Sequence, residues 1–201
     1  TAGGGGAGAG QAELDPDTVT REAAGHPMFI QELIRSRAAL GSVRPLRLED
    51  ALWARIAQLD REARDLLELI AIGGRPLVQE IAARALGIDT GPFGQRVAKL
   101  RAAHLVRTTG AYQDVRIEVY HDRVRDTVLA RLDGLTRRGH HQALARALSG
   151  CESFAELDQR VRHLASAGDT ARAAVYAEDA ATRARETLAF DREVELLRTA
   201  I

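Results

Sequence analysis

The chain has 201 residues, of which 45% are hydrophobic and 28% charged, with 28 basic and 28 acidic side chains. This length suits one large or two small globular domains, and the balanced charge gives no field that would favour nucleic acid or an acidic membrane surface. Aromatic residues make up only 4%, while Ala, Leu and Val are plentiful, which favours packed helices over a β-sandwich.

Residues 1–10 are a low-complexity run of mostly glycine and alanine, so we expect residues 1–14 to form a flexible Gly-rich linker. This run is not a phosphate-binding P-loop, because that loop needs Gly-Lys-Ser/Thr, and no lysine follows here. Lys99 is the only lysine, and its neighbours include no glycine. We therefore expect no catalytic residues in this chain and no enzymatic activity from it alone.

Two helices are predicted next. Asp15-Pro16-Asp17 is typical of a helix start, with proline early and acids in the first turn, and this helix should end at Gly25. Pro27 begins the second helix, which Gly41 closes. Its apolar residues recur with the 3.6-residue period: Phe29, Ile30, Leu33, Ile34 and Ala38.

From Leu48 to Tyr120 the pattern predicts four helices and then a β-hairpin. The first helix carries Leu52, Trp53, Ile56 and Leu59, and Asp60 caps the second, which a Gly-Gly-Arg-Pro sequence ends. The remaining helices are expected over 77–86 and 93–103, and the hairpin strands over 105–108 and 115–120. Several helices followed by a two-stranded wing are typical of a winged-helix domain.

The rest of the chain is predicted to be helical with short breaks. The expected helices span 121–132, 135–148, 154–167 and 170–185, with a further one from about Thr187. Small residues between Ala173 and Ala184 would let neighbouring helices approach closely. This is how a tetratricopeptide-type solenoid starts, although one clear helix pair does not establish a period.

Two short motifs carry the functional hypothesis. Tyr120-His121-Asp122 follows the hairpin and opens a helix, where unpaired first-turn amides and the helix dipole favour an anion. Far upstream, Gly25-His26-Pro27 precedes an apolar run. In this order, the two motifs indicate the regulatory part of a nucleotide switch.

With these motifs, the chain resembles the signal-transducing STAND ATPases, a branch of the AAA+ nucleotide switches. Among them it is most similar to large bacterial regulators that join an ATPase module to a helical-repeat region. The likeness covers roughly residues 15–201, and the matching segments occur in the family's order: 22–29, 100–106, 119–122 and 162–169. The resemblance implies that Gly25 and Pro27 approach the adenine and ribose. It further implies that His121, beside Asp122, contacts the β-phosphate of ADP in the closed state. The chain departs from the family at His26, where such relatives often carry Asn, and in lacking Walker A and B motifs.

The resemblance also implies a mainly α fold in four parts. These are a linker over 1–14, ATPase lid helices over 15–47, a winged-helix domain over 48–133 and a tetratricopeptide-like segment over 134–201. An upstream P-loop domain outside this chain would hold ATP or ADP with Mg²⁺. The repeats would bind a protein partner or an effector, and the parent protein could carry a serine/threonine kinase, a nucleotide cyclase or a transcription regulator.

Each motif also has a purely structural interpretation. Pro27 can start a helix and Gly25 can end one without any ligand. His121 can pack against the wing, with Asp122 serving the helix dipole. Two other functions therefore stay open: a protein-interaction scaffold without nucleotide dependence, and a DNA-binding winged helix. The neutral net charge argues against DNA, since the fourth helix offers only Arg96, Lys99 and Arg101.

Metal and membrane sites are not expected. His140 and His141 are adjacent, so on a helix they project about 100° apart and make a poor metal pair. Cys151 is the only cysteine, which excludes an internal disulfide or a cysteine zinc cluster. No apolar run approaches the roughly 20 residues of a membrane-spanning helix, and no signal-peptide pattern opens the chain. We expect a cytoplasmic location, and a fragment of a longer protein because the chain ends within a helical pattern.

Overall fold

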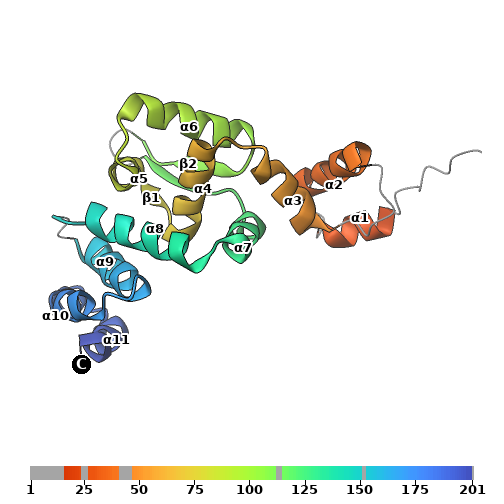
Figure 1. Cartoon of the computed structure of the whole chain (residues 1–201). Coiled ribbons are helices and arrows are strands. Elements are labelled where there is room, and N and C mark those ends of the chain that lie inside the picture. The colour runs from red at the N-terminus through yellow and green to blue at the C-terminus, as the bar shows by residue number, and fades with distance from the viewer. Residues whose placement is uncertain (1–15, 24–26, 41–46, 112–114, 151–152, 201) are drawn as a thin grey trace, which may run out of the picture. The chain divides into compact units, whose positions relative to one another are not determined.

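The computed structural model describes residues 16–23, 27–40, 47–111, 115–150 and 153–200. These residues form 11 α-helices and one small three-stranded antiparallel sheet (Figure 1). The predicted mainly α class is confirmed. The chain divides into two compact units, residues 1–58 and 59–201.

The first unit contains three helices: α1 (Pro16–Glu22), α2 (Pro27–Leu40) and α3 (Leu48–Ala57). Proline stands at the start of α1 and of α2, as predicted, because its fixed φ suits the first helical turn and its missing N–H costs nothing there. The apolar face of each helix supplies the core of the unit: Val19, Phe29, Leu33, Leu48, Leu52 and Ile56. The expected linker over 1–14 lies outside the described residues.

Helix α4 (Arg61–Gly73) packs against several elements of the second unit, and its buried stripe includes Leu66, Leu67 and Ile70. Its predicted N-cap is confirmed, because the Asp60 carboxylate accepts a hydrogen bond from the Ala63 amide at 2.7 Å. Bonds from the Lys99 ammonium and from this amide hold the pKa of Asp60 below its usual range.

The sheet consists of β1 (Leu77–Val78), β2 (Val106–Thr109) and β3 (Arg116–Val119), in the order β1-β3-β2. The predicted hairpin is confirmed as β2 and β3, which pair in antiparallel register. The prediction of only two strands was wrong. Leu77 and Val78 were expected to open a helix, but they pair with β3, and α5 (Gln79–Leu86) begins after them. A two-residue strand has no visible period, and its partner lies far along the chain, so only the folded chain reveals it.

The other predicted helices are present, with ends within three residues of those expected. They are α6 (Thr90–Ala102), α7 (Asp122–Arg131), α8 (Gly134–Ala147), α9 (Phe154–Ser166), α10 (Thr170–Glu186) and α11 (Phe190–Ala200). Helices α9, α10 and α11 pack one against the next (Figure 1). Alanines of α10 fill this contact: Ala177, Ala180, Ala181 and Ala184. The close approach that small residues predict is therefore observed. No helix among the described residues has the length and apolar character to cross a membrane.

Candidate anion site

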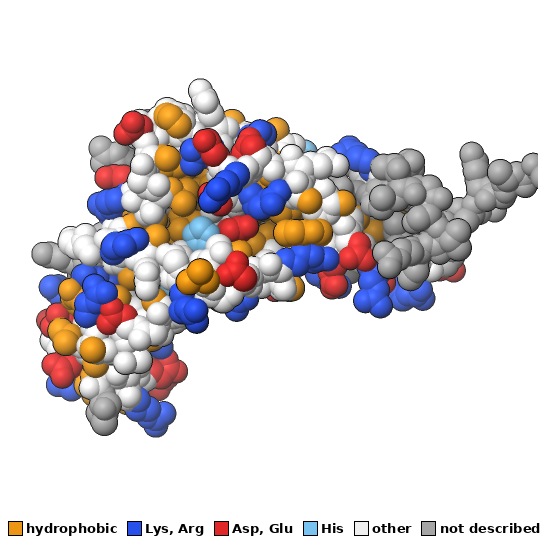
Figure 2. All heavy atoms as spheres, in the orientation of Figure 1, with side chains coloured by type: hydrophobic (Ala, Val, Ile, Leu, Met, Phe, Trp, Pro, Cys, Tyr) orange, Lys and Arg blue, Asp and Glu red, His pale blue; other side chains and the backbone are white. Residues whose placement is uncertain are grey.

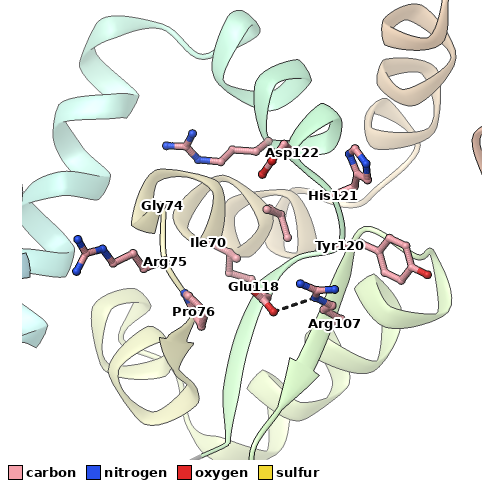
Figure 3. Close-up of a pocket in the computed structure, with 11 residues that line it drawn as sticks. Ile70, Gly74, Arg75, Pro76, Arg107, Glu118, Tyr120, His121 and Asp122 are labelled. Atoms are coloured by element: carbon pink, nitrogen blue, oxygen red, sulfur yellow. Dashed lines mark hydrogen bonds and ion pairs between the residues drawn. The ribbon is translucent and has the colours of Figure 1, made fainter. Parts of the chain in front are cut away.

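A cavity of about 280 Å³ lies where α4 ends, β3 ends and α7 begins (Figure 3). Its lining is polar, with three arginines and a histidine set against two carboxylates. The lining residues are Ile70, Gly74, Arg75, Pro76, Arg107, Glu118, Val119, Tyr120, His121, Asp122 and Arg125. The cavity belongs entirely to the second unit, and basic groups predominate in it.

His121 is the N-cap of α7. Its backbone is extended, with φ −156° and ψ 149°, and its Nδ1 accepts a hydrogen bond from the Arg123 amide at 3.2 Å. Since Nδ1 is the acceptor, the proton of the neutral ring belongs on Nε2, which can donate. The cap also occupies one of the first-turn amides that the sequence suggested for an anion.

The turn after α4 brings Arg75 to the cavity. Gly74 adopts φ +68°, and a Cβ there would lie 3.2 Å from Arg125 Nη2. A Cβ on Gly73 would lie 2.8 Å from Leu77 Cδ1. Glycine therefore suits the left-handed backbone at position 74, and a larger residue at position 73 would make the Leu77 side chain shift.

Two of the three arginines of the cavity, Arg107 and Arg125, have different hydrogen-bond partners. Arg107 Nε donates to Glu118 Oε1 at 2.8 Å, so this pair is locally neutral. Arg125 Nε donates to the Ala71 carbonyl at 3.0 Å, where the end of α4 carries partial negative charge. Because a backbone carbonyl has no formal charge, this hydrogen bond does not neutralise Arg125. Such a site can attract an anion the size of a phosphate group.

The structure brings together two of the four predicted site residues, since His121 and Asp122 both line the cavity. Pro27 is the exposed first residue of α2, in the first compact unit, and Gly25 lies outside the described residues. The sequence analysis missed Arg75, Arg107 and Arg125. The glycine pair before Arg75 indicated a turn, but nothing local indicated that the turn faces the start of α7.

A histidine pair between α8 and α9 was also missed. His141 Nδ1 lies 2.9 Å from His163 Nδ1, and His163 is 1% exposed. Burial, with smaller contributions from nearby arginines and histidines, lowers the pKa of His141 to about 4 and that of His163 to about 3. His140 faces elsewhere, with Nε2 3.4 Å from Glu68 Oε2. The described residues include no group of three or more potential ligands that could hold a metal ion.

The basic residues of α6 are mostly engaged with the start of α4. Arg96 Nη2 lies 2.8 Å from Glu62 Oε2, and Lys99 pairs with Asp60. On the molecular face in Figure 2, basic and acidic side chains intermingle, with no large patch of one sign. This arrangement favours a structural role for these bases.

No protein family, no curated protein and no solved structure matches the chain. The functional interpretation therefore depends on the geometry of the cavity and on the motifs that line it.

Proposed function

We propose that the chain is the regulatory part of a nucleotide-switched signalling ATPase of the STAND type. It would sense ADP or ATP held with Mg²⁺ by an upstream P-loop domain and pass the nucleotide state to the helices after α8. One observation carries this proposal: His121 and Asp122 line a cavity together with Arg75, Arg107 and Arg125. His121, to which the resemblance assigns the phosphate contact, thus lines the same cavity as three arginines.

The order of the elements supports the proposal. From α4 to β3 the chain runs helix, strand, helix, helix, strand, strand, which is the order of a winged-helix domain with β2 and β3 as its wing. Helices α1 and α2 would be the lid, and α9 to α11 the first repeats. The winged-helix domain expected over 48–133 would include α3, which falls in the first compact unit. The elements from α4 to β3 all lie in the second unit, and they give the winged-helix order without α3.

In the proposed switch, His121 donates from Nε2 to the β-phosphate of ADP, and Arg75 and Arg125 add positive charge. Exchange of ADP for ATP removes the contact to His121, and the closed state of α7 and the wing loses this stabilising interaction. The helical segment or an attached effector is then exposed. A switch of this kind needs a coupling free energy of about 1 to 3 kcal/mol between its two states.

The second candidate is a protein-interaction scaffold without nucleotide dependence. It is favoured by large apolar side chains exposed on and next to the last helices: Val175, Leu188, Phe190, Val194 and Leu197. DNA binding is a weaker third candidate, because two basic residues of α6 already pair with carboxylates of the same unit. Binding to duplex DNA that weakens steeply with salt would favour it.

The test is ADP binding to the protein encoded by the full reading frame. We expect His121→Ala to weaken ADP binding by about 10- to 100-fold, because a hydrogen bond to a charged group contributes about 1.5 to 3 kcal/mol. Arg138→Ala, at an exposed position of α8, is the matched control and should leave the affinity unchanged. Equal ADP affinity in the wild type and His121→Ala would overturn the proposal, as would a reading frame without a P-loop.

A further inference from the structure

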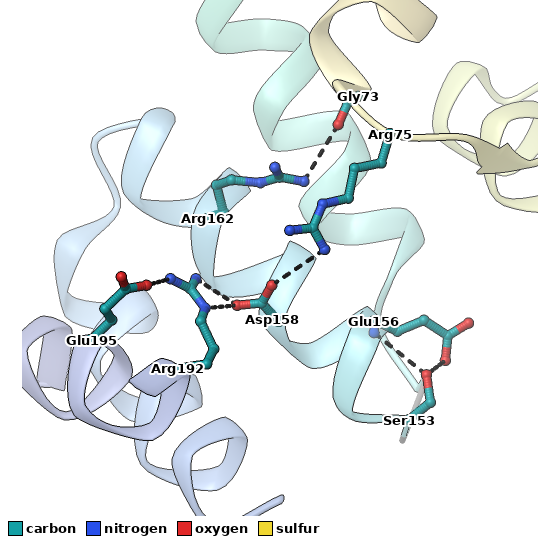
Figure 4. A network of polar contacts seen from close by, with 8 residues as sticks. All are labelled: Gly73, Arg75, Ser153, Glu156, Asp158, Arg162, Arg192 and Glu195. Carbon is teal, nitrogen blue, oxygen red and sulfur yellow. Dashed lines mark hydrogen bonds and ion pairs between the residues drawn. The ribbon is translucent and has the colours of Figure 1, made fainter. Parts of the chain in front are cut away.

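Arg75 is a lining residue of the cavity, and its guanidinium points toward α9 (Figure 4). Its Nη1 lies 3.8 Å from Asp158 Oδ2 on α9. The Asp158 side chain is only 6% exposed, whereas that of Arg75 is 55% exposed. The long ion pair and the exposed guanidinium leave Arg75 room to turn toward the cavity.

Asp158 joins α9 to α11 as well as to Arg75. Arg192 Nε donates to Asp158 Oδ1 at 2.7 Å, and Arg192 also pairs with Glu195. Two nitrogens of the Arg192 guanidinium, Nε and Nη2, contact Asp158, and Nη1 contacts Glu195, so its single positive charge is shared between two carboxylates. Arg75 adds a second, more distant positive charge on the other oxygen of this buried carboxylate.

Positive charge is nevertheless in excess around this contact. Arg162 of α9 donates from Nη2 to the Gly73 carbonyl at 3.4 Å, and its buried Nε finds no hydrogen-bond partner among the described residues. Burial, followed by the charges of Arg75, Arg192 and Arg125, lowers the pKa of Arg162. An anion in the adjoining cavity would therefore lie next to a cluster in which arginines outnumber carboxylates.

We propose that Arg75 couples the cavity to helices α9 and α11. A diphosphate group bound in the cavity draws the Arg75 guanidinium away from Asp158, and the contact of Asp158 with α11 loosens. The inference rests on the proposed function for its ligand, and it adds the residue through which the site acts on the helices. Because coupling is reciprocal, whatever frees Arg75 from Asp158 must strengthen anion binding.

The reciprocity can be measured on the 201-residue chain with inorganic pyrophosphate as the probe. Amide chemical shifts of Gly74 and Arg125 report binding. Asp158→Asn frees Arg75 and should tighten binding by about fivefold or more, the lower end of typical allosteric coupling. Arg75→Ala should weaken binding. In the double variant, Asp158→Asn should no longer increase the affinity.

Hydrogen exchange of the wild type keeps the inference testable if Asp158→Asn fails to fold. Saturating pyrophosphate should speed amide exchange in α9 and α11 of the wild type and leave it unchanged in Arg75→Ala. Arg198→Ala, at an exposed position of α11, is the matched control and should respond like the wild type.

Two results would overturn the inference. The first is pyrophosphate binding that His121→Ala weakens but that leaves exchange in α9 and α11 unchanged; the proposed function would then stand without this coupling. The second is no pyrophosphate binding at all by the wild-type chain. That result counts against the inference alone, since the proposed function is judged by ADP binding in the protein encoded by the full reading frame.

Discussion

At the start of α7, His121 combines two tasks that substitutions can separate. Its Nδ1 caps the helix by accepting a hydrogen bond from the Arg123 amide. Its Nε2–H is the group that would donate a hydrogen bond to a phosphate. Removing the ring by His121→Ala affects both tasks, so a loss of ADP binding in that variant could reflect a frayed helix. An asparagine keeps a good capping acceptor, but its side chain is too short to replace the Nε2–H donor of the ring.

We expect His121→Asn to keep the wild-type free energy of unfolding and still to lose ADP affinity in the protein encoded by the full reading frame. His121→Ala should lose the same affinity and, in addition, about 1 kcal/mol of stability, which is typical of a lost N-cap. Urea unfolding of the 201-residue chain measures the free energy of unfolding, and ADP titration of the protein encoded by the full reading frame measures the affinity. If His121→Asn binds ADP like the wild type, His121 serves only as a cap.

Among the elements, those with local signals were predictable from the sequence. Helix α4 has the Asp60 cap, a clear apolar stripe and a glycine end, and each of these acts within a few residues. Strand β1 has no such signal, because β3 alone makes it a strand. The same holds for the cavity: His121 and Asp122 stand in a recognisable motif, whereas Arg75 and Arg125 reach it only through the packing of α4 against α7.

The histidine pair between α8 and α9 makes the stability of that contact depend on pH. The pKa of His163 is lowered to about 3 and that of His141 to about 4 in the folded chain, against 6.5 for the free side chain. The unfolded chain therefore binds more protons between these values, so stability rises with pH over the window from about 3 to 6.5. The contribution is complete above this window and is lost as the pH falls through it.

We expect the free energy of unfolding to decrease as the pH is lowered from about 6.5, with a slope of at most about 1.4 kcal/mol per pH unit for each histidine. His163→Gln should be less stable at neutral pH, because it loses a buried ring, but its slope should be shallower than that of the wild type. Urea unfolding at several pH values measures both effects. An equal slope in the variant would mean that the pair does not set the acid sensitivity.

At the scale of the whole molecule, the proposed nucleotide contacts are divided between the two compact units. Residues 59–201 contain the entire cavity, which is where phosphates are expected. Residues 1–58 contain Pro27, which the proposed family resemblance would place near adenine and ribose. Of these two units, a ligand that lacks the nucleoside should therefore depend only on the second, whereas ADP should depend on both.

In the protein encoded by the full reading frame, we expect Pro27→Ala to weaken ADP binding while leaving pyrophosphate binding unchanged, and His121→Ala to weaken both. The comparison is fair because Pro27 begins α2, where alanine is also tolerated. Pro16→Ala is the matched control, since Pro16 begins α1 in the same way. Isothermal titration with the two ligands separates the contributions. If Pro27→Ala and Pro16→Ala bind ADP equally well, Pro27 only starts a helix, and the part of the site in this chain is confined to the cavity beside α7.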